Sequence, residues 1–291
     1  MYKFIESDLD PQNLDKKPFK FFHKLRNHPA LSLENLSKVL VNLPKGQVMY
    51  SKGLDDLNAN FDRAHIDQKN GLTIEETIEN IRTSDSYIMV RSPEVDPSFK
   101  ELYQDLIHDI EIVMNEKGVG KKAIEPMLFL FIASPNAFTP FHIDRYSTFL
   151  FQIRGSKQVA VFDQFDEGVV PAETRESFAD YGPLRPGWSE SIDNRAHKFQ
   201  FSPGEALHIP FIAGHYIKNG PEDVSISMSI IFRTKQSKVW LDAMSVNNRL
   251  RTKAKMSVVP VGKFDKKDKL KALLFPAINV LSILKNALRN K

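Results

Sequence analysis

The spacing of apolar residues divides the chain into a helical first part and a strand-rich second part. In the first part, apolar side chains recur three and four positions apart, which is the period of an amphipathic helix. The longest such run has apolar residues at Leu102, Leu106, Ile110 and Val113. We expect a helix here that is capped by Asp96 or Ser98 and that ends near Glu116.

Two shorter helices and two strands are expected before residue 95. A serine precedes the helix expected at Leu33–Leu43, and Thr73-Ile-Glu-Glu76 is the capping-box pattern of a helix that runs to about Thr83. The segments Gly46–Ser51 and Ser86–Arg91 have the composition of strands.

The pattern changes between Glu125 and Thr234, where short apolar runs are separated by Pro, Gly, Asn and Asp. Strands are expected at Met127–Ala133, Thr148–Ile153, Gln158–Phe162, Ala206–Pro210 and Ser225–Phe232. Many short strands with turn residues between them are typical of a β-sandwich or barrel. The expected fold is mainly β with helices (α+β), built on a double-stranded β-helix, or jelly-roll, core.

Three regions follow from these patterns. Residues 1–122 form an N-terminal helical and mixed part that packs on the barrel, residues 123–236 form the barrel, and residues 237–291 form a basic helical tail. Within the tail we expect a helix at Val239–Asn248 and a basic linker at Pro260–Lys271. A last amphipathic helix is expected at Lys271–Leu288, interrupted by Pro276.

The absence of cysteine narrows the chemistry. With no Cys among 291 residues, the chain has no disulfides, cysteine–zinc sites, iron–sulfur clusters or cysteine nucleophiles. A bound metal would therefore need His, Asp or Glu ligands. The first residues lack a signal-peptide pattern and no apolar run is long enough to span a membrane, so we expect a cytoplasmic protein.

The tail also concentrates positive charge. The whole chain has a net charge of +4, but residues 249–291 contain 12 Lys and Arg and only 2 acidic residues. We favour a helix that binds a partner or self-associates, as in a homodimer, for the C-terminal helix; contact with an anionic membrane surface and plain packing are the alternatives. No nucleic-acid-binding motif is present, so nucleic acid is not an expected partner.

The main candidate site is the segment Thr139-Pro-Phe-His142-Ile-Asp144. Side chains at positions i and i+2 of a strand share one face, so His142 and Asp144 can aim at one point. His215, which follows the turn after Ile209-Pro, is a third ligand from another strand. Two His and one carboxylate on one face of an octahedron are typical of non-haem Fe(II) oxygenases, because three positions stay open. Two of these can chelate a 2-oxoacid and the third can bind O₂.

The tripeptide His-Ile-Asp is not specific by itself, because His65-Ile-Asp67 repeats it. That second copy precedes the turn residues Gln68–Gly71 and then the helix at Thr73, so we expect it to be a surface loop.

The setting of His142 is more specific. The segment from Pro135 to Phe162 resembles the JmjC branch of the cupin superfamily of oxygenases. It is similar to the asparaginyl hydroxylase that inhibits hypoxia-inducible factor and to bacterial cupin-like proteins. The matching positions are Thr139, His142, Asp144, Gln152-Ile-Arg-Gly155, Lys157 and Ile209-Pro-Phe-Ile-Ala-Gly-His215. The resemblance covers the barrel, roughly Glu125–Thr234.

This resemblance implies roles for further residues. Lys157 would pair with the distal carboxylate of the cosubstrate 2-oxoglutarate, and Thr139 would assist it. Thr148, and Ser227 or Ser229, stand where the family often has Asn near the cosubstrate. The implied cofactors are Fe(II) and 2-oxoglutarate.

Five further residues are candidates near the site. His208 is either a pocket residue or a core residue, and both readings stay open. Arg145 and Tyr146 can line the pocket mouth. The polar segment Tyr181–Ala196 is expected to flank the substrate entrance, with Arg185 and Trp188 as contacts.

The favoured function is an Fe(II)- and 2-oxoglutarate-dependent dioxygenase, of the hydroxylase type, that acts on a small molecule or a peptide. A non-catalytic cupin-like module that binds metal or a regulatory ligand is the first alternative. A metal-cupin enzyme without a cosubstrate is weaker, because no additional ligand stands near Asp144 at a suitable spacing. The sequence does not name the substrate.

Overall fold

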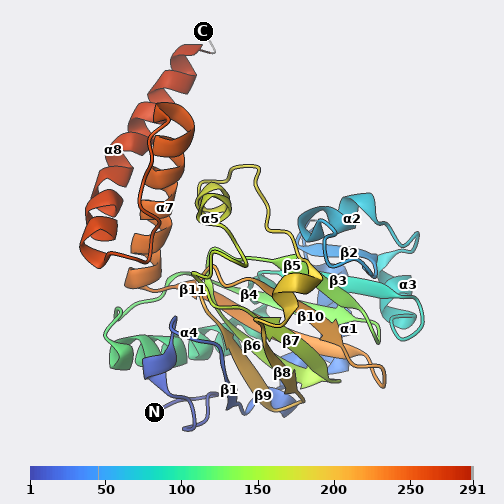
Figure 1. The fold of residues 1–291 in the computed structure, drawn as a ribbon. Helices are drawn as coiled ribbons and strands as arrows, with labels where there is room; N and C mark the ends of the chain where they lie inside the picture. Colours follow the sequence, from blue (N-terminus) through green and yellow to red (C-terminus); the bar gives the residue numbers. More distant parts are fainter. Residues whose placement is uncertain (45, 290–291) are drawn as a thin grey trace.

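Two antiparallel sheets face each other in the computed structural model, which describes residues 1–44 and 46–289, with backbone alone at 62 and 280–289 (Figure 1). The larger sheet has the order β1 (Phe19–Phe22), β9 (Glu205–Ile209), β6 (Ser147–Arg154), β11 (Ser225–Arg233), β4 (Ile124–Ala133), β3 (Ser86–Arg91) and β2 (Val48–Lys52). The smaller sheet has the order β5 (Phe138–His142), β10 (His215–Asn219), β7 (Lys157–Val161) and β8 (His197–Phe201). The expected α+β fold with a jelly-roll core is confirmed.

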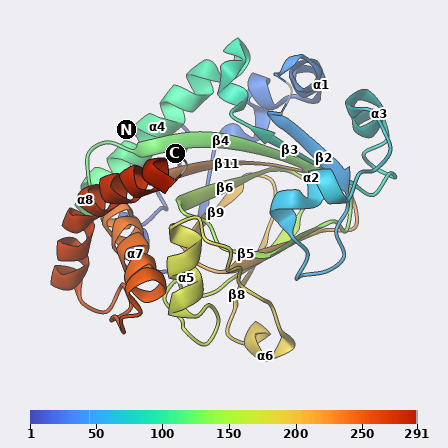
Figure 2. The ribbon, with the colours of Figure 1, turned by 90° about the horizontal axis from the view of Figure 1, so that it is seen from above.

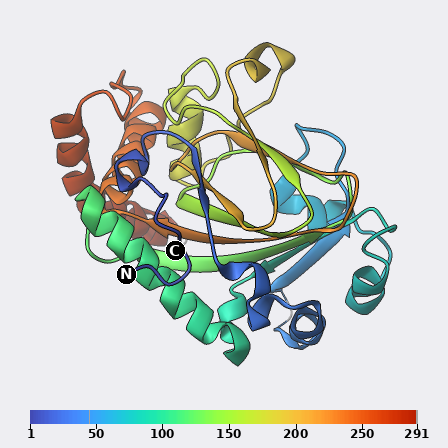
Figure 3. The ribbon, with the colours of Figure 1, turned by 90° about the horizontal axis from the view of Figure 1, so that it is seen from below.

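The larger sheet is buried on both faces, and strand β11 illustrates how. Its residues Ile226, Met228, Ile230 and Phe232 belong to the main hydrophobic core. The alternate residues Ser227 and Ser229 are also buried but point to the barrel interior, because successive strand side chains face opposite ways. The outer face is covered by helix α4 (Pro97–Lys117), which runs along it in two views (Figures 2 and 3).

The N-terminal helices follow the capping signals closely. Helix α1 (Leu33–Asn42) is capped by Ser32, and α3 (Ile74–Glu79) has the expected capping box of Thr73 and Glu76. The expected end of α3 near Thr83 was wrong, because Asn80 leaves the helical conformation and caps it. The expected loop at His65-Ile-Asp67 was also wrong: the tripeptide lies in a short helix, α2 (Ala64–Asp67), which an Arg63–Asp67 ion pair stabilises.

The C-terminal part is a helical hairpin that projects beyond the barrel (Figure 1). Helix α7 (Lys235–Ala254) is longer than expected and packs on α5 (Ala172–Ala179) and on α8 (Asp265–Arg289). The expected linker up to Lys271 was wrong, because α8 already begins at Asp265. Pro276 was expected to interrupt the helix but lies inside α8. A proline removes only one helical N–H, and packing along α7 lets the helix continue.

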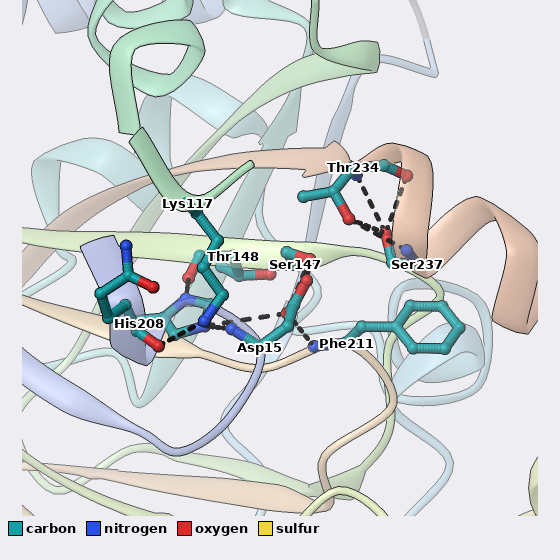
Figure 4. Close-up of polar contacts among 9 residues, drawn as sticks. Asp15, Lys117, Ser147, Thr148, His208, Phe211, Thr234 and Ser237 are labelled. Atoms are coloured by element: carbon teal, nitrogen blue, oxygen red, sulfur yellow. Dashed lines mark hydrogen bonds and ion pairs between the residues drawn. The ribbon is translucent and has the colours of Figure 1, made fainter. Parts of the chain in front are cut away.

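Asp15 and His208 join the N-terminal segment to the barrel (Figure 4). The Asp15 carboxylate accepts hydrogen bonds from the Ser147 hydroxyl at 2.7 Å and from the Phe211 N–H at 2.9 Å. The Asp15 N–H donates to Nε2 of His208 at 3.0 Å, and Nδ1 of His208 donates to the Thr148 carbonyl at 3.1 Å. Burial lowers the pKa of His208 to about 3, so its ring is neutral and can both accept and donate.

A second buried carboxylate holds the first residues of the chain. Asp109, on α4, is fully buried and accepts hydrogen bonds from the backbone N–H groups of Lys3, Phe4 and Ile5, at 2.7, 2.8 and 3.0 Å. Three amides that no strand or helix partner satisfies are thereby bonded inside the protein.

The turn between β6 and β7 depends on Gly155. Its φ of +67° lies in the left-handed region, and a Cβ there would come within 2.6 Å of the Val224 carbonyl oxygen. Glycine therefore meets both a conformational and a steric requirement, and the turn sets the position at which β7 begins with Lys157.

Replacing this glycine should destabilise the protein. We expect Gly155→Ala to lower the free energy of unfolding by roughly 1–3 kcal/mol, from strain at positive φ and from the clash. Gly71→Ala is the matched control, since Gly71 also has a positive φ, +79°, but open space around its Cβ position. Denaturant unfolding monitored by circular dichroism measures both; equal losses would show that the Val224 contact is unimportant.

Candidate metal centre

Three ligand groups converge at one end of the barrel. Nitrogen atoms of His142 and His215 and a carboxylate oxygen of Asp144 all lie within 4.8 Å of one another. His142 ends β5 and His215 begins β10, and the two residues are directly paired across the sheet. Oδ2 of Asp144 lies 3.6 Å from Nε2 of His215 and 4.0 Å from Nε2 of His142. The sequence motif therefore does bring its three members together.

Both imidazoles are held with Nε2 toward the centre. Nδ1 of His142 lies 2.7 Å from the Pro140 carbonyl, and Nδ1 of His215 lies 3.0 Å from the Ala213 carbonyl. A carbonyl only accepts, so each Nδ1 carries a proton and Nε2 is the nitrogen that remains for a metal. Burial, and then the neighbouring His142, lower the pKa of His215 to about 4, although Asp144 opposes this. A neutral ring is the form that binds a metal.

Asp144 lies just outside the strand that supplies His142. Strand β5 ends at His142, so the assumption that one strand holds both residues was only partly right. The Asp144 carbonyl instead accepts a hydrogen bond from the N–H of Ile212, at 3.0 Å. Ile212 has a φ of +60°, an unfavourable conformation for a β-branched residue, in the turn before His215. This bond fixes the carboxylate relative to the second histidine.

A bulge in β5 explains how Thr139 joins the same cavity. Thr139 pairs with Ile217 and His142 with His215, so two residues of β5 lie opposite the single residue Tyr216. Positions three apart in a regular strand face opposite ways, but the extra residue turns Thr139 to the side of His142. Pro140, which has no N–H to donate, occupies the bulge.

Lys157 is a buried cation in the same cavity. Its side chain is 95% buried and donates to the Ser227 hydroxyl at 2.7 Å. No carboxylate among the described residues pairs with it, and burial lowers its pKa to about 7. A buried ammonium group with only a hydroxyl partner can accept an anion as a counter-ion.

Three hydroxyl groups and a phenol complete this end of the cavity. The Thr139 and Tyr87 hydroxyls are 3.3 Å apart, and both are buried. Thr148 and Ser229 also line the cavity, and the buried Thr148 Oγ1 has no hydrogen-bond partner. All the candidate cosubstrate residues therefore lie in one space with the three metal-ligand candidates.

This cavity has a volume of about 360 Å³ and largely aromatic walls. They are formed by Phe61, Tyr87, Met89, Phe129, Phe131, Phe178 and Ile231. Arg145, Tyr146 and Arg185 line it as expected, and the Arg145 guanidinium lies between the rings of Phe178 and Tyr181, at 3.8 and 4.1 Å from their centroids.

Two expected contacts lie outside the lining. Trp188 does not line the cavity: its backbone N–H donates to Oδ1 of Asn58 at 2.8 Å, and Asn58 lines the cavity. His208 is a core residue rather than a pocket residue, although it holds the Thr148 carbonyl.

Sequence reasoning missed Tyr87, Met89 and Phe61. The first two alternate on β3, which was recognised as a strand, but its pairing with β4 could not be read from the sequence. Phe61 reaches the site from a short 3-10 helix (Phe61–Arg63) that precedes α2, and its ring centroid lies 5.6 Å from that of His142.

The buried lysine should give stability a characteristic dependence on pH. The pKa of Lys157 is about 7 in the folded protein and about 10.5 when exposed, so folding releases a proton between these values. Burial of the charged lysine lowers the free energy of unfolding most below pH 7, and this loss diminishes as the pH rises toward 10.5. The free energy of unfolding should therefore increase between these two pH values. Relative to Lys157→Met, we expect the free energy of unfolding to increase by up to about 1.4 kcal/mol per pH unit.

Denaturant unfolding at pH 6, 7.5 and 9 measures this difference without any ligand. Lys218→Met is the control, because Lys218 is exposed on β10 of the same barrel. Parallel pH curves for the wild type and Lys157→Met would mean that Lys157 keeps an ordinary pKa.

Comparisons with known proteins agree with this architecture. The sequence profile of the cupin-like domain family matches residues 24–238. The X-ray structure of ycfD from E. coli superposes with a TM-score of 0.50 at 13% identity, and covers 96% of this chain and 70% of that one. At 13% identity this similarity is evidence for the fold alone.

Two further structures of YcfD are similar to lower degrees. One, titled as a ribosomal oxygenase from Escherichia coli, has a TM-score of 0.47 at 13% identity, with 96% and 68% of the two chains covered. The other, a complex of YcfD with cobalt and succinic acid, has a TM-score of 0.45 at 13% identity, with 92% and 64% covered. No curated protein matches the sequence. The matched segment contains the whole candidate centre and about three quarters of the chain, and the protein therefore belongs to the cupin-like domain family.

Proposed function

We propose that this protein is an Fe(II)- and 2-oxoglutarate-dependent oxygenase of the hydroxylase type. The observation that carries the proposal is the position of Lys157. A buried lysine with no carboxylate partner among the described residues lines one cavity with two imidazoles and a carboxylate. A dicarboxylate cosubstrate can reach the metal with one end and the lysine with the other.

The donor set fits the proposed metal. Two imidazole nitrogens and one carboxylate oxygen suit Fe(II), and a set without cysteine leaves little affinity for softer ions. With 2-oxoglutarate, such a metal supplies oxidative decarboxylation to succinate and CO₂, coupled to insertion of one oxygen atom of O₂ into the substrate.

The protein's own residues would orient the reactants and keep water out. The hydrogen bonds from Nδ1 of His142 and His215 to backbone carbonyls fix both rings before any ligand arrives. Lys157 and Thr139 would hold the distal carboxylate of 2-oxoglutarate. The unpartnered Thr148 hydroxyl would donate to the same molecule, since a buried hydroxyl without a partner is costly. The aromatic walls would exclude water from the reacting atoms.

The binding of 2-oxoglutarate tests the role of Lys157. We expect Mn(II)-loaded protein to bind 2-oxoglutarate in isothermal titration, and Lys157→Ala to weaken binding roughly 10- to 100-fold, through loss of a charge-assisted hydrogen bond. Lys218→Ala should bind normally. Undiminished binding by Lys157→Ala would refute the proposed orientation of the cosubstrate.

The two His-Ile-Asp tripeptides offer an internal control for the metal ligands. We expect Asp144→Ala to lose metal binding, measured by titration with Mn(II), and to lose release of succinate from 2-oxoglutarate. Asp67→Ala should keep both, because Asp67 lies in α2 and pairs with Arg63. Tight binding of metal and 2-oxoglutarate by the wild type, with no succinate formed across a broad panel of substrates, would favour a non-catalytic cupin-like module.

A further inference from the structure

The outer face of α8 is an apolar stripe with no partner among the described residues. Leu270, Leu273 and Leu274 are 61%, 77% and 49% exposed, and Ala277 is exposed as well. These positions are three and four apart, so they lie on one side of the helix. The opposite side packs on α7, where Phe275 lies near the cationic groups of Lys238 and Arg249. Single exposed leucines are ordinary, but an aligned stripe indicates a contact surface.

Exposed lysines accompany this stripe. Lys266 and Lys267 precede Leu270 by four and three residues, so they stand on the same side of α8, and both are exposed. Lys263 and Lys269 are exposed nearby, with more than half of each side chain accessible. Phe264, 52% exposed, lies under the Lys267 ammonium group at 4.8 Å from it.

Nearby acidic residues neutralise only part of this positive charge. Asp268 is 1% exposed and accepts a hydrogen bond from the Gly262 N–H inside the hairpin connection. Asp265 pairs with Lys269 at 2.6 Å and accepts a hydrogen bond from Gln236, and Glu167 pairs with Lys263 at 3.1 Å. The two lysines on the side of the stripe, Lys266 and Lys267, have no carboxylate partner among the described residues.

We propose that α8 docks on an anionic membrane surface through this stripe. Leucines and phenylalanine would enter the interface between head groups and acyl chains, while the lysines would contact anionic head groups. A symmetric contact with a second copy would bury the leucines beside like charges, with no exposed carboxylate on the stripe to balance them. No helix within the described residues has the length and apolar character needed to cross a bilayer, so the contact would be peripheral. The sequence continues the apolar spacing at 281, 284 and 288, beyond the described side chains.

Vesicle co-sedimentation of the full chain tests this proposal. We expect the protein to pellet with vesicles of phosphatidylcholine and phosphatidylserine, to remain in solution with pure phosphatidylcholine, and to be released by salt. Leu273→Asp, and separately the double variant Lys266→Glu/Lys267→Glu, should each lower vesicle affinity on the order of tenfold or more.

Matched controls lie elsewhere on the surface. Leu33→Asp alters a leucine on α1 that is 55% exposed, and Lys69→Glu/Lys121→Glu reverses two exposed lysines far from α8 in the sequence. Both should bind vesicles like the wild type, and circular dichroism should show that all variants fold. Absence of binding to anionic vesicles, or equal losses in the controls, would overturn the proposal. A dimer in sedimentation velocity that Leu273→Asp dissociates, without vesicle binding, would assign the stripe to a second copy instead.

Discussion

The pairing of His142 with His215 across β5 and β10 is the constraint on which the candidate centre depends. A slip of one residue would turn one imidazole to the other face of the sheet. Two features flank this pair. The bulge at Pro140 turns Thr139 toward the cavity, and the hydrogen bond from the Ile212 N–H to the Asp144 carbonyl holds Asp144 beside His215. Three ligands from two elements are thus positioned by backbone pairing before any metal binds.

Successive side chains of a strand point to opposite faces, so one sheet can line both the hydrophobic core and the cavity. On β11, large apolar residues face α4, and serines face the barrel interior. The Ser227 hydroxyl accepts a hydrogen bond from Lys157, and Ser229 lines the cavity. Because both faces are buried, a polar residue on this strand is informative: it is there to bond to something inside the barrel.

Much of the fold and of the candidate centre could be predicted from the sequence, because the patterns that indicate them involve residues close together in the chain. Helix caps, turn residues and apolar spacing gave the long helix α4 and most barrel strands, and the spacing of His142, Lys157 and His215 indicated the centre. What could not be predicted depends on pairing between distant segments. Tyr87 reaches the site through the β3–β4 pairing, and α8 passes Pro276 because α7 lies beside it. The short strands β1 and β8 lack a strong period of their own and exist through their neighbours.

The hydrogen bonds to Asp109 anchor the first residues inside the protein. Terminal segments are commonly the first to fray, yet the amides of Lys3, Phe4 and Ile5 converge on one carboxylate at the middle of the longest N-terminal helix. Removing those residues would leave the buried Asp109 carboxyl group without these three donors, which lie 104 to 106 positions away in sequence. The loss would therefore destabilise the packing of α4 on the outer face of the larger sheet.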